Sequence, residues 1–252
     1  MSERFLIINA DDLGLSEEIN AGILQGLIHG FVSDTSLLVK APFAPQAFSG
    51  LKSLGIGHAG IHINLDSLLG WEPGGIEHKT RHMLTILMND KAFLRECTLE
   101  AMDQIEIFMS SGLIPTHLDT HHHVHGFLPV FDILVALIEK YRIPAIRFSR
   151  HGYRLPTRED IPFENKVYQH MEDTLRLNRI FFCTNYLEGA DKVCDAGKGT
   201  TEIVVHPSQG GELWRTKEME SLMTETGAVR TEGSGMKLIS YKDALGHKIM
   251  TS

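Results

Sequence analysis

The chain has 252 residues, 42% of them hydrophobic and 22% charged, which is the size and composition of a folded protein with a full hydrophobic core. A formal net charge of −8 argues against a nucleic-acid partner, which would require clustered Lys and Arg. No apolar run approaches the roughly 18 residues that cross a bilayer, and the chain leads into a strand without a cleavable signal. We therefore expect a cytoplasmic protein with no membrane partner.

Short apolar strand patterns alternate with helical patterns along the chain. The first strand is predicted at residues 5–10, and the first helix runs from Ser16, its N-cap, to His29, with Gly30 as its stop signal. Further strands are predicted at residues 36–39, 60–65, 115–118, 145–148, 202–205 and 237–240. Further helices are predicted at residues 93–111, 128–141, 172–182, 217–225 and 242–248.

This alternation predicts an α/β fold with a parallel sheet covered by helices, either closed as a barrel or open and doubly wound. Nothing marks a domain boundary, so we expect one domain over residues 1–252. Polar residues recur at or just after the strand ends, namely Asp11, Asp12, His62, Asp119, His121, Arg147 and His206. So many contributing strands favour a TIM-like barrel with its site at the C-terminal strand ends, over a crevice in an open sheet.

Residues 116–125, Thr-His-Leu-Asp-Thr-His-His-His-Val-His, carry five imidazoles and one carboxylate. An expression tag would lie at a terminus, whereas this segment lies between a predicted strand and a predicted helix. We interpret it as part of a metal or active site, since imidazole is the commonest protein ligand for such metals. His117 and His121 would share one face of a helix, but Pro115 favours a strand that ends in a loop, so both rings need not bind the metal. The three cysteines have no metal-binding spacing, which leaves nitrogen and oxygen ligands.

Two adjacent carboxylates, Asp11 and Asp12, come at the end of the first strand, where neighbouring side chains are expected to point to opposite sides. One could bind a metal while the other acts as a general base; the alternative is a turn with a helix cap. His62, alone, would be read as a core histidine. Together with an Asp and a second His it completes a facial ligand set that leaves positions for water and substrate.

Two more polar residues follow apolar strand patterns. His206, before Pro207, is a candidate general acid, although a structural histidine at a strand end is equally consistent with the sequence. Arg147 could orient a carboxylate or stabilise developing negative charge, and a structural ion pair explains it equally well.

Four motifs, in this order, resemble the YdjC-like carbohydrate deacetylases, of which chitooligosaccharide deacetylase is the best-known type. They are N-A-D-D-L-G at 9–14, G-I-H-I-N-L at 60–65, T-H-L-D-T-H-H-H-V-H at 116–125 and V-V-H-P at 204–207. The resemblance continues to L-I-S-Y at 238–241. It implies a distorted TIM-like barrel, one divalent metal ion, usually magnesium, and hydrolysis of the N-acetyl group of a small N-acetylated sugar or oligosaccharide.

Transferred position by position, the resemblance implies that Asp12, His62 and His121 bind the metal. Asp11 resembles the base that activates water, and His206 resembles the acid that protonates the departing amine. Substrate-binding or supporting roles are expected for His123, His125, Arg147 and Asp119.

Three features of the sequence bear on which metal and which substrate the protein binds. Two His and one Asp would suit zinc, manganese or iron at least as well as magnesium. The sequence departs from the family pattern after Leu65, where Asp66 and Ser67 stand in place of Thr and a G-K-P-like loop. Trp71 and Trp214 could stack on sugar rings, although an isolated tryptophan more often serves packing.

Three other functions compete with the deacetylase. One is hydrolysis of another amide or a lactam, and a second is phosphoester hydrolysis, which would call for a Gly-rich cradle or a basic cluster. The third is a non-catalytic, metal-binding regulatory protein. The presence of both Asp11 and His206 argues against it, since metal binding alone requires neither. Dimerisation is a common default, and no motif indicates an interface.

Overall fold

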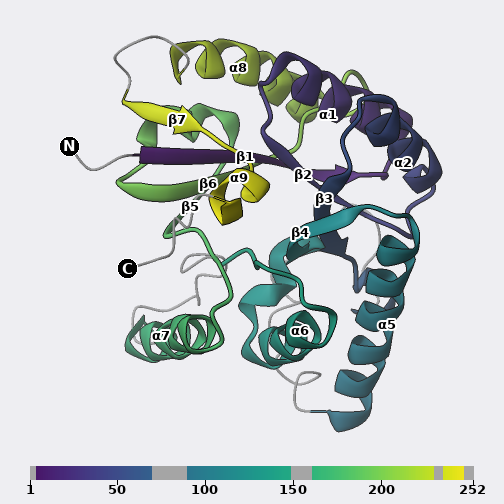
Figure 1. Ribbon diagram of the computed structural model, residues 1–252, viewed down its shortest axis with the longest axis vertical. Coiled ribbons are helices and arrows are strands. Elements are labelled where there is room, and N and C mark those ends of the chain that lie inside the picture. The colour runs from purple at the N-terminus through teal and green to yellow at the C-terminus, as the bar shows by residue number, and fades with distance from the viewer. Residues whose placement is uncertain (1–3, 70–89, 149–160, 230–234, 247–252) are drawn as a thin grey trace.

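The computed structural model describes residues 4–69, 90–148, 161–229 and 235–246, in which parallel strands are surrounded by helices (Figure 1). The strands are β1 (Arg4–Leu13), β2 (Asp34–Leu37), β3 (His58–Ile63), β4 (Ile114–Thr120), β5 (Asn185–Glu188), β6 (Gly199–Val205) and β7 (Met236–Leu238). The α-helices are α1 (Glu17–His29), α2 (Ala44–Ser53), α3 (Asp66–Leu69), α5 (Lys91–Ser110), α6 (Leu128–Tyr141), α7 (Ile161–Leu177), α8 (Leu213–Val229) and α9 (Tyr241–Gly246). Two 3-10 helices are η1 (His121–Gly126) and η2 (Ala190–Asp195).

The strands pair in the order β4-β3-β2-β1-β6-β5, and β7 pairs with the N-terminal part of β1. Two single bridges connect the ends of this sheet: Leu118 of β4 pairs with Ile146, and Ala145 pairs with Phe181, which leads into β5. The fold is therefore a distorted TIM-like barrel, as predicted. Residues 145–148 form only these bridges and not the predicted strand, since pairing is limited to Ala145 and Ile146.

Several predicted elements are confirmed. Ser16 caps α1 by accepting a 3.2 Å hydrogen bond from the N–H of Ile19, and Gly30 ends the helix at φ 68°. Helix α6 covers the predicted residues, and α8 begins earlier than predicted. The helix predicted at residues 172–182 is partly wrong, because α7 begins earlier and ends at Leu177, and Phe181 pairs with Ala145 instead.

Helix α2 and strand β5 were not predicted. Helix α2 packs against α1 and buries only Ala44, Ala47 and Leu51, and β5 is only half-buried, so neither segment contains a strongly apolar pattern.

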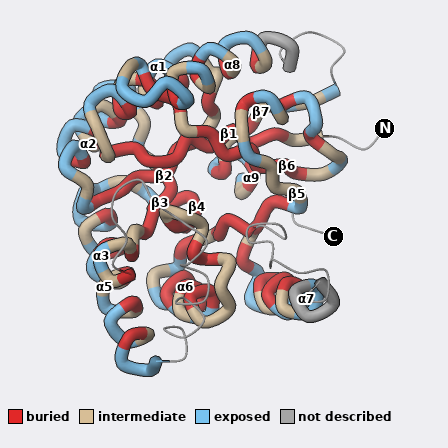
Figure 2. The backbone as a smooth tube through the Cα atoms, turned by 180° about the vertical axis from the view of Figure 1, so that it is seen from behind, coloured by how far each residue is buried: buried red, intermediate tan, exposed pale blue. Residues whose placement is uncertain are grey.

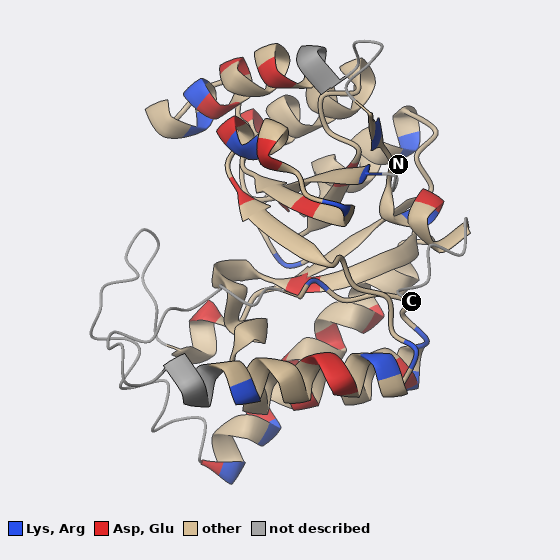
Figure 3. Cartoon of the chain, turned by 90° about the vertical axis from the view of Figure 1, so that its left-hand side faces the viewer, with Lys and Arg blue, Asp and Glu red and all other residues tan. Residues whose placement is uncertain are grey.

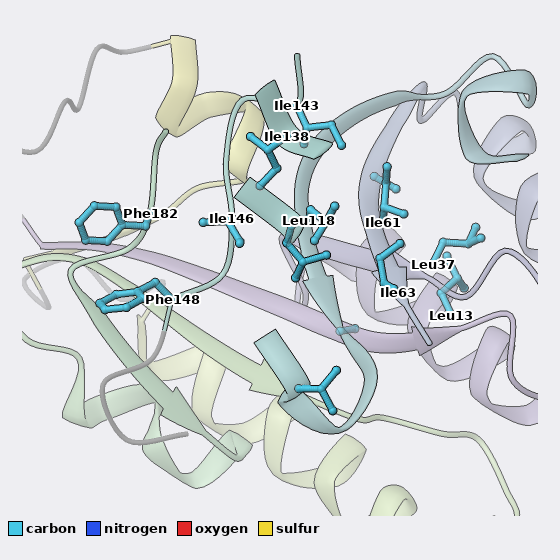
Figure 4. Close-up of a cluster of buried hydrophobic side chains, with 14 of the residues drawn as sticks. Leu13, Leu37, Ile61, Ile63, Leu118, Ile138, Ile143, Ile146, Phe148 and Phe182 are labelled. Carbon is cyan, nitrogen blue, oxygen red and sulfur yellow. The ribbon is translucent and has the colours of Figure 1, made fainter. Parts of the chain in front are cut away.

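The strands are the most deeply buried part of the fold, and the helices expose their outer faces (Figure 2). The hydrophobic core lies where strands meet helices. Figure 4 shows Leu13, Leu37, Ile61 and Ile63 gathered on β1 to β3, at a distance from Phe148. On β6, Ile203 and Val205 belong to this core, whereas Glu202, on the opposite side of the strand from Ile203, is a buried carboxylate. The core-facing sides of the strands pack against the helices, and the interior of the barrel holds buried polar groups beside a small apolar cluster that includes Ile7 and Tyr241.

Charged residues cover the outer helices, where acidic and basic positions are interspersed (Figure 3). Within the described ranges, each helix is too short or too polar to cross a membrane. Most of the charge is thus solvated on the helices, and the exceptions are concentrated inside the barrel at the strand ends.

Candidate functional site

Strand β1 ends in a bulge that turns the adjacent carboxylates of Asp11 and Asp12 toward the same nitrogen of His62. Its register with β2 shifts between Ala10 and Leu13, and Asp12 has a positive φ of 70°. His62 Nε2 lies 3.9 Å from Asp11 Oδ2 and 3.5 Å from Asp12 Oδ1. The prediction that the two carboxylates would point to opposite sides is wrong, because the bulge interrupts the alternation of the strand.

Asp12, His62 and His121 converge on one point. Asp12 Oδ1 is 3.0 Å from His121 Nδ1 and 3.5 Å from His62 Nε2, and the three ligand atoms lie within 4.8 Å of one another. Although it is buried, Asp12 Oδ1 faces the two imidazole nitrogens without a well-aligned hydrogen bond to any described residue. A buried carboxylate oxygen without a well-aligned donor is costly, and a cation between these three atoms would satisfy it. These residues fit a divalent metal ion.

The other nitrogen of His62 is fixed by Asp119. His62 Nδ1 lies 2.7 Å from Asp119 Oδ1 and 3.3 Å from Ser36 Oγ. Burial lowers the pKa of His62, but Asp119 and Asp11 outweigh burial and raise it to about 10. A carboxylate on Nδ1 directs the lone pair of Nε2 toward a metal, which would take the place of the second proton.

Arg147 is fully buried behind these groups and contacts three carboxylates. It donates to Asp11 from Nη1 (2.6 Å) and Nη2 (2.7 Å), to Glu202 from Nε (2.9 Å), and lies 2.8 Å from Asp119 Oδ2. Burial raises the pKa of Asp11, but Arg147 and His62 reverse the effect and hold it below its usual value. Asp11 is therefore anionic at neutral pH and locked in orientation.

Arg215 is a site residue that the sequence analysis missed. It lies in the first turn of α8, and its Nη2 donates to Asp12 Oδ2 at 2.7 Å across 203 positions of sequence. Nothing in its local pattern indicates this contact, because it depends on where the start of α8 lies relative to the end of β1.

The buried charges around the site do not balance. Four carboxylates and two guanidiniums lie together, namely Asp11, Asp12, Asp119, Glu202, Arg147 and Arg215. With His62 neutral, as a metal ligand must be, four negative groups against two positive groups leave a formal charge of −2, which a divalent cation would compensate. The pKa of Glu202 is raised, since burial outweighs Arg147, and the hydroxyl of Tyr241 donates to it at 2.8 Å.

A second group of possible ligands surrounds Asp66, the residue at which the sequence departs from the family pattern. His122 Nδ1 lies 3.0 Å from Asp66 Oδ1, and His121 Nε2 lies 3.7 Å from Asp66 Oδ2. This carboxylate is hydrogen-bonded and its side chain is 21% exposed, whereas that of Asp12 is 2% exposed. A cation would therefore stabilise the buried ligand group of Asp12, His62 and His121 more than the group around Asp66.

His206 lies at the rim, directly after β6. Its backbone N–H donates to Glu218 Oε2 at 2.6 Å, and its Nδ1 is 3.9 Å from the same oxygen. The ring is 26% exposed and meets the ring of Trp214 edge-on, with centroids 5.7 Å apart. His206 is thus oriented and accessible to a ligand. Trp71 lies outside the described residues.

His123 and His125 line the side of the site next to β5. His123 Nε2 is 3.3 Å from both Tyr186 Oη and Glu188 Oε1, and His125 Nδ1 is 2.8 Å from Thr120 Oγ1. Burial lowers the pKa of His123 to about 3 and that of His125 well below its usual value. Both rings are neutral, and neither belongs to the ligand groups around Asp12 or Asp66.

The chain matches the family model of YdjC-like proteins over residues 5–229. It is 30% identical to a carbohydrate deacetylase of Geobacillus stearothermophilus, over 95% of this chain and 98% of the relative. It is 26% identical to a chitooligosaccharide deacetylase of Proteus mirabilis, over 95% and 98% of the two chains.

Its fold is similar to that of a crystal structure from Enterococcus faecalis, provisionally described as a cellobiose-phosphate cleavage protein. The TM-score is 0.69 and the identity 23%, over 96% of this chain and 99% of the other, which shows a shared fold. Because the family match covers most of the chain and the barrel is shared, the protein belongs to the YdjC-like family.

Proposed function

We propose that this protein is a metal-dependent hydrolase that removes the N-acetyl group from an N-acetylated sugar or chitooligosaccharide. The observation that carries the proposal is the convergence of Asp12, His62 and His121 beside a second carboxylate, Asp11. The printed names of the relatives, carbohydrate deacetylase and chitooligosaccharide deacetylase, support the choice of substrate.

Asp12, His62 and His121 would hold the cation. Bound there, a divalent metal would polarise the acetyl oxygen and make water a better nucleophile. Two imidazoles and one carboxylate suit zinc, manganese or iron at least as well as the magnesium that the family resemblance implies.

Asp11 is the proposed base. Its Oδ1 accepts hydrogen bonds from Asn9, Ser36 and Arg147, whereas Oδ2 accepts only from Arg147 among the described residues. Oδ2 is also the oxygen that faces His62 Nε2. Because Oδ2 accepts fewer hydrogen bonds and faces the ligand groups, it takes the proton from the attacking water.

His206 is the proposed acid. Water adds to the acetyl carbon, the bond from carbon to nitrogen breaks, and the amine leaves with a proton from the His206 ring as acetate forms. The hydrogen bond to Glu218 and the exposed ring edge allow this side chain to reach a substrate at the rim. Asp11 and His206 thus carry out the two proton transfers of the same hydrolysis.

Acetate release tests the proposal. Metal-stripped protein is reloaded with magnesium, zinc, manganese or iron and given N-acetylglucosamine, chitobiose and chitotriose. We expect acetate only with a metal, and none from Asp11→Asn that retains bound metal. Release that survives metal removal or Asp11→Asn would contradict the mechanism, and no release from any sugar at full metal occupancy would contradict the function.

A further inference from the structure

We propose that Trp214 is the platform on which a sugar ring of the substrate stacks, and that Arg215 fixes this platform in position. The inference rests on the proposed function and assigns a substrate-binding role to two neighbouring residues at the start of α8. The ligand is an N-acetylated pyranose ring, either the reacting sugar or its neighbour in an oligosaccharide.

The Trp214 ring is exposed to solvent, but its orientation is restricted by a neighbouring side chain. The residue is 49% exposed, and the guanidinium carbon of Arg215 lies 4.5 Å from the ring centroid, over one face. Arg215 is itself held by Asp12 at 2.7 Å and by Glu212 at 3.1 Å. A cation fixed over one face restricts the rotation of the ring, so binding on the open side costs little conformational entropy.

The same contacts fix the position of the Trp214 ring relative to the proposed catalytic site. The chain of contacts from Asp12 through Arg215 to Trp214 connects a proposed metal ligand to the platform. His206, the proposed acid, has its ring centroid 5.7 Å from that of Trp214. The amine that His206 protonates is attached directly to the sugar ring, so a sugar with its nitrogen at His206 must lie beside Trp214.

A buried donor of Arg215 that lacks a hydrogen-bond partner indicates that the ligand carries polar groups. Arg215 Nη1 is buried and has no hydrogen-bond partner among the described residues, and the whole residue is 7% exposed. An unsatisfied buried donor is unfavourable, and a hydroxyl or acetyl oxygen of the sugar would satisfy it. A sugar supplies both an apolar C–H face for the tryptophan and oxygens at its edge for the guanidinium.

Calorimetric titration of metal-loaded protein in an Asp11→Asn background, which should bind chitotriose without hydrolysing it, tests the platform. We expect Trp214→Ala to raise Kd about tenfold and Trp214→Phe, which keeps an aromatic face, only a few-fold. Leu213→Ala is the matched control, because Leu213 is the neighbouring residue of α8 and is 67% exposed. An unchanged Kd for Trp214→Ala, or an equal loss in Leu213→Ala, would overturn the inference.

Acetate release separates this inference from the proposed function. Loss of a binding platform should raise KM in Trp214→Ala while kcat stays within a few-fold. If wild-type protein releases acetate but Trp214→Ala has the same Kd and KM, the platform is wrong and the deacetylase stands. If chitotriose binds through Trp214 without acetate release, the platform stands and the deacetylase fails. Absence of both binding and release would overturn both.

Discussion

Arg147 donates two hydrogen bonds to Asp11, from Nη1 to Oδ2 at 2.6 Å and from Nη2 to Oδ1 at 2.7 Å, across 136 positions of sequence. The same guanidinium pairs with Asp119 and Glu202. The proposed base is therefore oriented by a group that also orients Asp119, the partner of His62. One buried side chain thus sets the geometry of both the proposed base and the proposed metal ligand.

Replacing Arg147 with Lys keeps the charge but removes the planar donor set. We expect a loss of about 3 kcal/mol in the free energy of unfolding, since buried carboxylates lose partners. Acetate release should fall roughly 100-fold as Asp11 moves. Urea unfolding and initial rates measure the two effects. Arg142→Lys is the control, because Arg142 is exposed at the end of α6. Wild-type behaviour of Arg147→Lys would show that the double hydrogen bond is dispensable.

Asp12 and Asp66 lie on opposite sides of His121 and can be distinguished by metal binding. Asp12→Asn should weaken zinc or manganese binding by about 100-fold or more, whereas Asp66→Asn and Asp11→Asn should change it only a few-fold. Calorimetry of the metal-free proteins gives both affinity and stoichiometry. If Asp66→Asn lost the metal and Asp12→Asn retained it, the cation would belong with His121 and His122 instead. Loss of metal in Asp11→Asn alone would reverse the roles of the two carboxylates.

Asp34, at the start of β2, should make stability depend on pH. Burial raises its pKa to about 7, although the N–H groups of Tyr241 and Thr35 donate to the carboxylate. In an unfolded chain the pKa of Asp is about 4, so the folded state binds this proton more tightly. The resulting stabilisation is complete below about pH 4 and is lost as the pH rises through about 7.

Asp34→Asn removes that titration. Relative to this variant, the free energy of unfolding of wild-type protein should fall by at most about 4 kcal/mol between pH 4 and pH 8. Denaturant unfolding across this range measures the difference, in which groups common to both proteins cancel. Parallel stability curves would show that the carboxyl group does not titrate in this interval.

Gly60 leaves room for a histidine inside the barrel. A Cβ at this position of β3 would overlap the imidazole of His117, whose ring stacks on Tyr241 with centroids 3.9 Å apart. Gly60→Ala should therefore lower the free energy of unfolding by about 1–3 kcal/mol through overpacking. Gly57→Ala is the control, since a Cβ there meets no atom within 4 Å. Equal thermal stability of the two variants would contradict this account of the packing.

Local sequence patterns were sufficient to predict those elements whose ends are marked by residues within one or two turns. Ser16 and Gly30 mark the ends of α1, because a cap needs only its own turn. The alternation of strands and helices predicted the barrel, since a parallel connection needs a crossover. Elements whose stability comes from contacts, such as α2 and β5, were missed.

The sequence by itself determined which residues would meet at the strand ends. Parallel strands bring their carboxyl ends to one rim, so Asp12, His62 and His121 are expected at the same rim, where the structure has them. Only the tertiary structure decided how these groups are supported. The bulge that turns Asp11 and Asp12 the same way depends on the register with β2, and the contacts of Arg147 and Arg215 join segments far apart in the chain. A long side chain finds its partner through the packing of whole elements, which no local pattern encodes.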